Sequence, residues 1–124
     1  MVAPFEAPRL KLARAERHIN ELAAEITEYL ADKPVAVIVE QPSELKEINS
    51  CSWVTRIRKP VPVALSAVIG DAIHNLRAAL DLLASDVVRL NGKDAKTVYF
   101  PFAASADLLE GQLNHYRLKP VGSL

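Results

Sequence analysis

The chain has 124 residues, 50% of them hydrophobic and 24% charged, which fits one soluble domain over residues 1–124 and excludes intrinsic disorder. Fifteen basic residues balance fifteen acidic ones, and this formal net charge of zero excludes a broad electrostatic attraction to nucleic acid. The N-terminus lacks the features of a signal peptide, and we expect no segment long enough to span a bilayer. The composition therefore predicts a cytoplasmic protein without a membrane partner, either complete or as a piece of a longer chain.

The first half of the chain predicts a helix followed by a β-hairpin. Apolar residues recur at helical spacing from about residue 9 to residue 31, and Pro34 ends this pattern. β-branched residues predict a strand over 35–40, and an imperfect alternation over 47–59 predicts a second strand paired antiparallel to it, after a turn at 41–43. The apolar stripe of the helix comprises Leu12, Ala15, Ile19, Leu22, Ala23, Ile26, Tyr29 and Leu30.

The second half predicts another long helix and a short one. A helical pattern runs over residues 63–90 and ends at an Asn-Gly pair, a strong signal for a helix C-terminus. Residues 97–102 are expected to form an extended segment that covers the helix pair, and Ser105 is expected to cap a final helix over 106–115. The apolar stripe of the long helix comprises Ile69, Ile73, Leu76, Leu80, Leu83, Val87 and Leu90.

These elements predict an α+β fold. Two long antiparallel amphipathic helices are expected to pack through their apolar stripes, with the β-hairpin between them in sequence and the short helix at the C-terminus. Because two helices and a hairpin of this size make a thin core, we expect a second copy to cover the remaining apolar surface, giving a homodimer.

The second long helix also gathers polar side chains suited to specific hydrogen bonding. Asp71, His74, Arg77 and Asp81 are spaced so that they share an arc of roughly 120°. Solvent-facing surfaces usually carry Lys and Glu, which are absent between residues 70 and 86. The row is therefore either a set of ion pairs, Arg77 with Asp81 and Asp71 with His74, or a binding surface. The candidate binding residues on this helix are Asp71, His74, Asn75, Arg77 and Asp81.

The predicted hairpin contributes a second candidate site. Arg56 and Arg58 share one face of the second strand and could hold a phosphate or another anion. The alternative is a solvated strand whose charges discourage edge pairing. The three histidines are dispersed, Cys51 is the single cysteine, and the sequence contains no phosphate-binding loop, so we expect neither a metal site nor a cofactor.

The polar helix carries a resemblance to other proteins. Residues 70–81, Gly-Asp-Ala-Ile-His-Asn-Leu-Arg-Ala-Ala-Leu-Asp, resemble an uncharacterised group of bacterial proteins whose helix reads approximately G-D-x-x-H-N-L-R-x-x-L-D-H. The likeness covers about residues 10 to 102. In that group the final histidine completes R-x-x-x-x-H, which is similar to the motif of HEPN ribonucleases. Those helical proteins usually pair two chains so that Arg and His line a cleft for RNA cleavage. Here Arg77 matches and Leu82 stands in the histidine position.

Two functions follow from these features. The residues themselves favour a noncatalytic binding or assembly module whose polar helix face organises a network within a dimer or toward a protein partner. The resemblance implies a HEPN-like protein that binds or cleaves RNA, or a degenerate relative of one. In that case His74 and Arg77 are the candidate catalytic residues, and Arg56 and Arg58 would hold phosphate.

Overall fold

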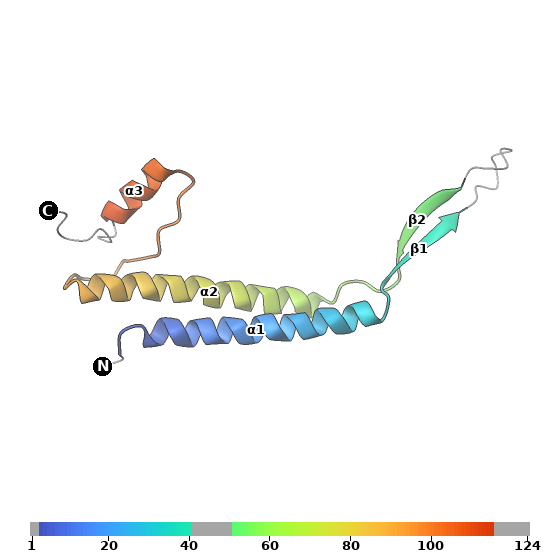
Figure 1. The fold of residues 1–124 in the computed structure, drawn as a ribbon, viewed down its shortest axis with the longest axis horizontal. Coiled ribbons are helices and arrows are strands. Elements are labelled where there is room, and N and C mark those ends of the chain that lie inside the picture. The colour runs from blue at the N-terminus through green and yellow to red at the C-terminus, as the bar shows by residue number, and fades with distance from the viewer. Residues whose placement is uncertain (1–2, 41–50, 116–124) are drawn as a thin grey trace.

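The computed structural model describes residues 3–40 and 51–115 (Figure 1). Its elements in chain order are α1 (Glu6–Ala31), β1 (Val35–Glu40), β2 (Ser52–Ile57), α2 (Val63–Leu90) and α3 (Ala106–His115). The predicted α+β fold, with two long helices, an antiparallel hairpin and a short C-terminal helix, is confirmed. The turn expected at 41–43 and the start of the second expected strand, residues 47–50, lie outside the described residues.

Helix α1 begins at Glu6, earlier than the periodicity indicated, because a proline such as Pro8 is tolerated in the first turn of a helix. Phe5 precedes the helix in a left-handed conformation with φ of 65°. Its backbone N–H donates a 3.0 Å hydrogen bond to Oδ2 of Asp86, near the C-terminal end of α2. This bond ties the start of α1 to the end of α2 and so fixes the antiparallel pairing of the two helices.

Lys33 follows α1 in a strained backbone conformation. Its φ is 48°, and its N–H donates to the carbonyl oxygen of Leu30 at 3.0 Å. Glycine adopts this left-handed geometry without the Cβ clash that other residues suffer. We expect Lys33→Gly to raise the free energy of unfolding by roughly 0.5–1 kcal/mol in chemical denaturation. Ala31→Gly, a change inside the helix, should instead lower it, and a loss of stability at both positions would contradict this account.

Helices α1 and α2 lie side by side and contact each other through small side chains (Figure 1). Ala15 of α1 is fully buried, and Leu65, Ala72 and Ala79 of α2, spaced by seven residues, are also buried. A seven-residue repeat keeps one row of side chains against a partner helix, and alanine lets the two backbones approach closely. The buried row of α2 therefore lies beside the predicted apolar stripe and not within it, and Ala15 is the one residue of the predicted α1 stripe that is buried.

The segment after α2 builds a small core of its own. Val88 is the largest fully buried side chain of the described residues, and it packs in a cluster with Ala84, Ala95 and Val98, against which Phe100 also packs. The extended segment thus lies on α2, whereas the sequence predicted that it would cover both helices. Ser105 caps α3 as predicted, since its Oγ accepts a 3.4 Å hydrogen bond from the N–H of Leu108.

The β-hairpin projects beyond the end of the helix pair (Figure 1). β1 pairs antiparallel with β2, with Val35 opposite Ile57 and Glu40 opposite Ser52. Among the described helices and strands, close contacts run only between α1 and α2 and between β1 and β2. The base of the hairpin is attached to α1 by a 2.8 Å hydrogen bond from the Tyr29 hydroxyl to the Lys59 carbonyl oxygen. The hairpin is therefore an arm, held at its base.

Helix α2 corrects one expectation from the sequence. With 28 residues and a mean hydropathy of 1.2 in its most apolar window, it is long and apolar enough to cross a membrane by length and composition. A single helix of this kind is weak evidence for a membrane span, since core helices of soluble proteins share these properties. The fold is consistent with a small soluble domain.

Candidate functional site

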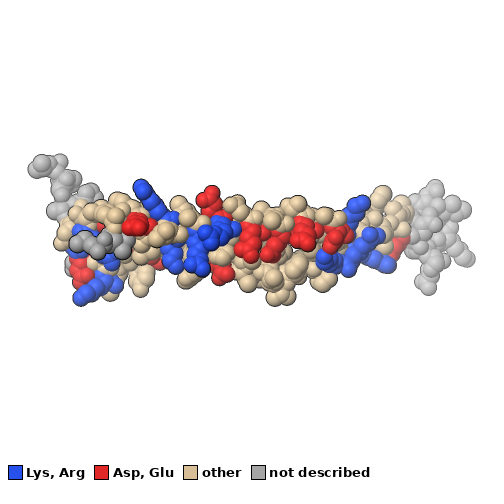
Figure 2. All heavy atoms as spheres, turned by 90° about the horizontal axis from the view of Figure 1, so that it is seen from below, with Lys and Arg blue, Asp and Glu red and all other residues tan. Residues whose placement is uncertain are grey.

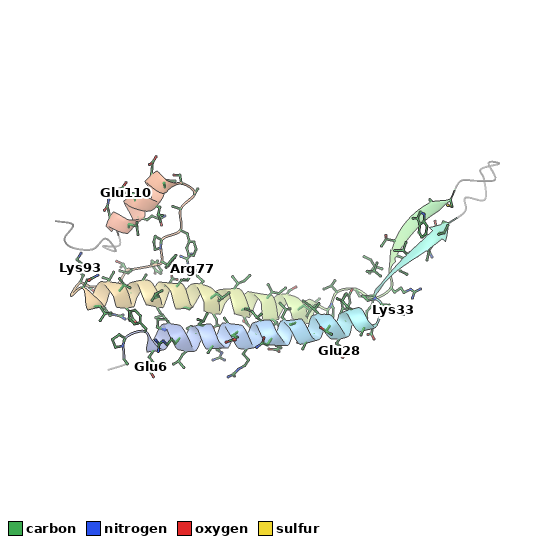
Figure 3. All side chains as sticks on the ribbon, viewed as in Figure 1. Glu6, Glu28, Lys33, Arg77, Lys93 and Glu110 are labelled. Carbon is green, nitrogen blue, oxygen red and sulfur yellow. The ribbon has the colours of Figure 1, made fainter. Side chains whose placement is uncertain are left out.

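Arg77, in the polar row of α2, lies on the side of the helix that faces away from α1 (Figure 3). Nε of Arg77 donates to Oδ2 of Asp81 at 3.3 Å, so the ion pair expected one helical turn apart is present. The other carboxylate oxygen of Asp81, Oδ1, accepts a 2.8 Å hydrogen bond from the backbone N–H of Phe100. Asp81 therefore connects α2 to the segment that leads to α3.

Arg77 contacts the same segment through its guanidinium group. The guanidinium carbon lies 4.3 Å from the centroid of the Phe102 ring, a cation–π distance. The Phe102 ring in turn lies 5.1 Å from that of Phe100, with an interplanar angle of 56°. The two charged side chains thus hold residues 100–102 against α2, which is a structural use of the row.

The remaining residues of the predicted row do not join this contact. Asp71 and His74 are exposed, and the ion pair expected between them is absent from the described residues. Asn75 is only 6% exposed, and its Nδ2 donates to the backbone carbonyl oxygen of Asp71 at 2.8 Å. The candidate binding residue Asn75 therefore lies away from the exposed row: it is three residues after Ala72 and four before Ala79, so it shares their buried face.

Leu82, in the position of the motif histidine, does not share a surface with Arg77. It lines a groove of about 520 Å³ together with Ala7, Asp86 and other residues near the start of α1. Five residues along a helix correspond to about 140° of rotation, which places Leu82 and Arg77 on different sides of α2. Within one chain, the residue in the histidine position therefore faces a groove that also contains the charged side chains of Asp86 and Arg89, and it does not face Arg77.

The candidate phosphate-binding residues of the hairpin lie apart from the polar row. Arg56 forms a 2.6 Å ion pair with Glu40 across the strands, and Arg58 follows the end of β2. Figure 3 places Lys33, at the base of the hairpin, and Arg77 at well-separated points along the molecule. The structure of one chain therefore does not bring Arg56 and Arg58 to His74 and Arg77.

The base of the arm is stabilised by Lys59, which forms an ion pair with Asp32. The hydrogen bond that the Lys59 ammonium group donates to Asp32, followed by the attraction of the negative charge of Asp32, raises the pKa of Lys59 above its ordinary value of 10.5. A raised pKa in the folded state stabilises the fold below the pKa of the unfolded chain, and this stabilisation is lost as the pH rises beyond it. Because the pair is exposed, we expect its effect on stability to be small.

The helix pair also exposes an apolar face. Its side chains belong to the predicted stripes, and each is between 36% and 61% exposed. We define the apolar face by Leu12, Ile19 and Ile26 of α1 and by Ile69, Ile73, Leu76 and Leu83 of α2.

The two helices contribute to one continuous surface. A groove of about 460 Å³ is lined by Leu12 from α1 and by Leu76, Leu80 and Leu83 from α2. Ile19 and Ile26 follow Leu12 at seven-residue intervals and so continue along the same side of α1. Sequence reasoning assigned these residues to the α1–α2 contact. The signal that separates the two roles is a second seven-residue row on α1, in which Pro8 and Ala15 are buried.

The outward side of α1 has a different character. Seen from below the view of Figure 1, the molecule carries a row of acidic side chains between groups of basic ones (Figure 2). Exposed charged residues of α1 include Arg14, Arg17, Glu21 and Glu28. Charges of both signs on this side are typical of a solvated helix surface. The apolar face is therefore not part of a generally apolar exterior.

No metal-binding arrangement is found among residues 3–40 and 51–115, where no three His, Cys, Asp or Glu side chains come together in a suitable way. Comparison of the chain with models of protein families, with curated proteins and with solved structures finds no match. The likeness of the polar helix to HEPN ribonucleases therefore stays a prediction.

Proposed function

We propose that this protein is a noncatalytic assembly module that forms a homodimer by packing the apolar face of each helix pair against that of a second copy. The observation that carries the proposal is the apolar face itself. Monomeric soluble proteins rarely leave a continuous surface of large aliphatic side chains in water. Covering the exposed half of one Leu or Ile side chain stabilises a complex by about 1 kcal/mol.

The total exposed surface supports the same proposal. The chain exposes 9923 Å², whereas a compact monomer of 13.6 kDa is expected to expose about 6,600 Å². The difference is several times the roughly 800 Å² that each partner contributes to a standard protein interface. The excess exposed area is therefore larger than a standard interface, and it includes the surface of the projecting arm as well as that of the helix pair.

A second helix pair fits the shape of the apolar face. Two antiparallel pairs packed face to face form a four-helix bundle, in which seven-residue rows of Leu and Ile fill the centre. A span through a membrane fits α2 less well, because Asp71, Arg77 and Asp81 lie on its other side, and charged groups are costly inside a bilayer. We therefore favour a protein partner and a cytoplasmic location.

Thermal unfolding at different protein concentrations tests the proposal. If the helix pair is stabilised by a second copy, the midpoint temperature Tm rises with concentration by mass action. We expect a progressive increase in Tm, followed by circular dichroism, across a roughly hundredfold range of chain concentration. A Tm that stays constant over this range would contradict a dimer that dissociates on unfolding.

One observation favours a HEPN-like RNA-binding or RNA-cleaving protein as a second candidate. His74 is exposed and lies one helical turn before Arg77, so an imidazole and a guanidinium share one side of α2. Against it, Arg77 is engaged by Asp81 and Phe102, and Arg56 is paired with Glu40. An RNA-cleavage assay on the His74 and Arg77 variants decides between the two candidates.

A further inference from the structure

The projecting arm carries an apolar surface of its own. Alternate residues of a strand share one side of a hairpin, and the register places Val35 opposite Ile57 and Val39 opposite Trp53. We define the arm face by Val35, Val37, Val39, Trp53 and Ile57, whose side chains are 49% to 74% exposed. The one remaining residue on this side, Thr55, is uncharged.

Nothing among the described residues of the same chain covers the arm face. Neither strand contacts a helix, and the attachments through Tyr29 and Lys59 lie at the base of the arm. A two-stranded hairpin is marginally stable in water unless a further layer packs on it. The arm face therefore needs an occupant from outside its own helix pair.

The chemistry of the arm face fits a second copy of itself. The charged pair of the hairpin, Glu40 and Arg56, belongs to the opposite side, where Arg56 is paired with Ala36 in the register. Two copies of an uncharged apolar face can meet about a two-fold axis without like charges opposing each other. Two twisted hairpins stacked in this way form a small sandwich with an apolar interior.

We propose that the arms of two copies pack arm face to arm face, and that the homodimer is therefore parallel, with both arms at the same end. The inference rests on the proposed assembly function and specifies its geometry. Helix packing alone permits two arrangements of the dimer. In one the two-fold axis runs along the bundle, and in the other it runs across the bundle. Neighbouring helices are antiparallel in both. Only the axis along the bundle brings the two arms together.

The two arrangements differ in whether the assembly stops growing at the dimer. When one two-fold axis serves both the apolar face and the arm face, each dimer covers both of its apolar surfaces and stops growing. An axis across the bundle places the arms at opposite ends, where each arm could pair only with an arm of another dimer. That arrangement would produce open-ended chains of dimers at high concentration.

Two natural reporters in the arm test this geometry. Cys51, the single cysteine, is exposed immediately before β2, and Trp53, the single tryptophan, belongs to the arm face. A spin label on Cys51 of the full chain allows the distance between two labels to be measured by pulsed electron paramagnetic resonance. We expect a distance well below the length of α2, which is about 42 Å for 28 residues. Trp53 fluorescence should be shielded from acrylamide in the dimer.

A matched pair of variants separates arm contact from dimer formation. Trp53→Thr keeps a residue suited to strands and removes the largest side chain of the arm face. We expect this variant to stay dimeric through the helices while its label distance broadens. Val54→Thr, the neighbouring position on the other side of the hairpin, should keep the short distance.

The mass of each labelled sample decides what a negative result means. A dimer whose label distance exceeds the length of α2 would overturn the parallel arrangement and leave the assembly function intact. Species larger than a dimer that grow with concentration would also overturn it, because the arms would then join separate dimers. A monomer would overturn both proposals.

Discussion

Ile73→Glu should convert the homodimer into a monomer that keeps its helices. Ile73 is 61% exposed in the single chain, so a glutamate there meets water in the monomer and costs little stability. In the dimer the carboxylate would be buried against the partner, and a two-fold contact buries two such groups. An unpaired buried charge costs several kcal/mol, so we expect the dissociation constant to rise by roughly 1,000-fold or more in sedimentation velocity.

The matched control is Leu10→Glu. Leu10 is similarly exposed, at 65%, but it lies two residues before Leu12 and hence about 200° around α1 from the apolar face. We expect this variant to remain dimeric. Dissociation of both variants, or of neither, would show that the apolar face is not the interface.

Asp81→Ala should loosen the segment between α2 and α3. The substitution removes the acceptor for the Phe100 N–H and the ion-pair partner of Arg77, leaving a partly buried donor without its bond. We expect a loss of about 1–3 kcal/mol in the free energy of unfolding, measured by urea denaturation. Asp81→Asn keeps an oxygen that can accept the same hydrogen bond and should lose less. Equal stability of wild type and Asp81→Ala would contradict the structural role.

The neighbouring polar residues separate this structural role from catalysis. Arg77→Ala should lose up to about 1 kcal/mol, because its contacts with Asp81 and Phe102 are partly exposed. His74→Ala should change stability by less than about 0.5 kcal/mol. Neither variant should differ from wild type in an RNA-cleavage assay. Cleavage by the wild type that is lost in both variants without unfolding would favour the HEPN-like candidate.

The ends of the two long helices and the start of α3 could be predicted because local signals mark them. Pro34 ends the first helical pattern, and Gly92, with φ of 71°, follows the end of α2 in the left-handed conformation that favours glycine. Ser105 precedes α3 as its cap. Each of these signals acts through the backbone within a few residues, so no knowledge of the tertiary fold is needed.

The choice of packing edge could not be predicted from the same patterns. Periodicity identifies the apolar side of a helix, but the stripes of α1 and α2 are wider than one partner helix can cover. The structure buries the alanine rows and leaves residues such as Ile19 and Ile73 exposed. Asn75 was grouped with the candidate binding residues because its neighbours are polar, although its spacing from Ala72 and Ala79 would have assigned it to the buried side.

The contacts made by Asp81 and Arg77 depend on residues about twenty positions further along the chain. The sequence indicated an ion pair between them, which the structure confirms. It gave no sign that Asp81 accepts from the Phe100 N–H or that Arg77 stacks on Phe102, because both contacts require the tertiary path of the segment after α2. The row of polar residues therefore resembled a binding site in the sequence. In the structure, its members Arg77 and Asp81 hold the segment after α2 in place.

Sedimentation equilibrium of the full chain at micromolar concentration shows whether a second copy of the chain covers the apolar face of the helix pair. We expect a mass of twice the 13.6 kDa chain for the wild type and of one chain for Ile73→Glu. A wild-type mass of 13.6 kDa throughout the micromolar range would contradict the account.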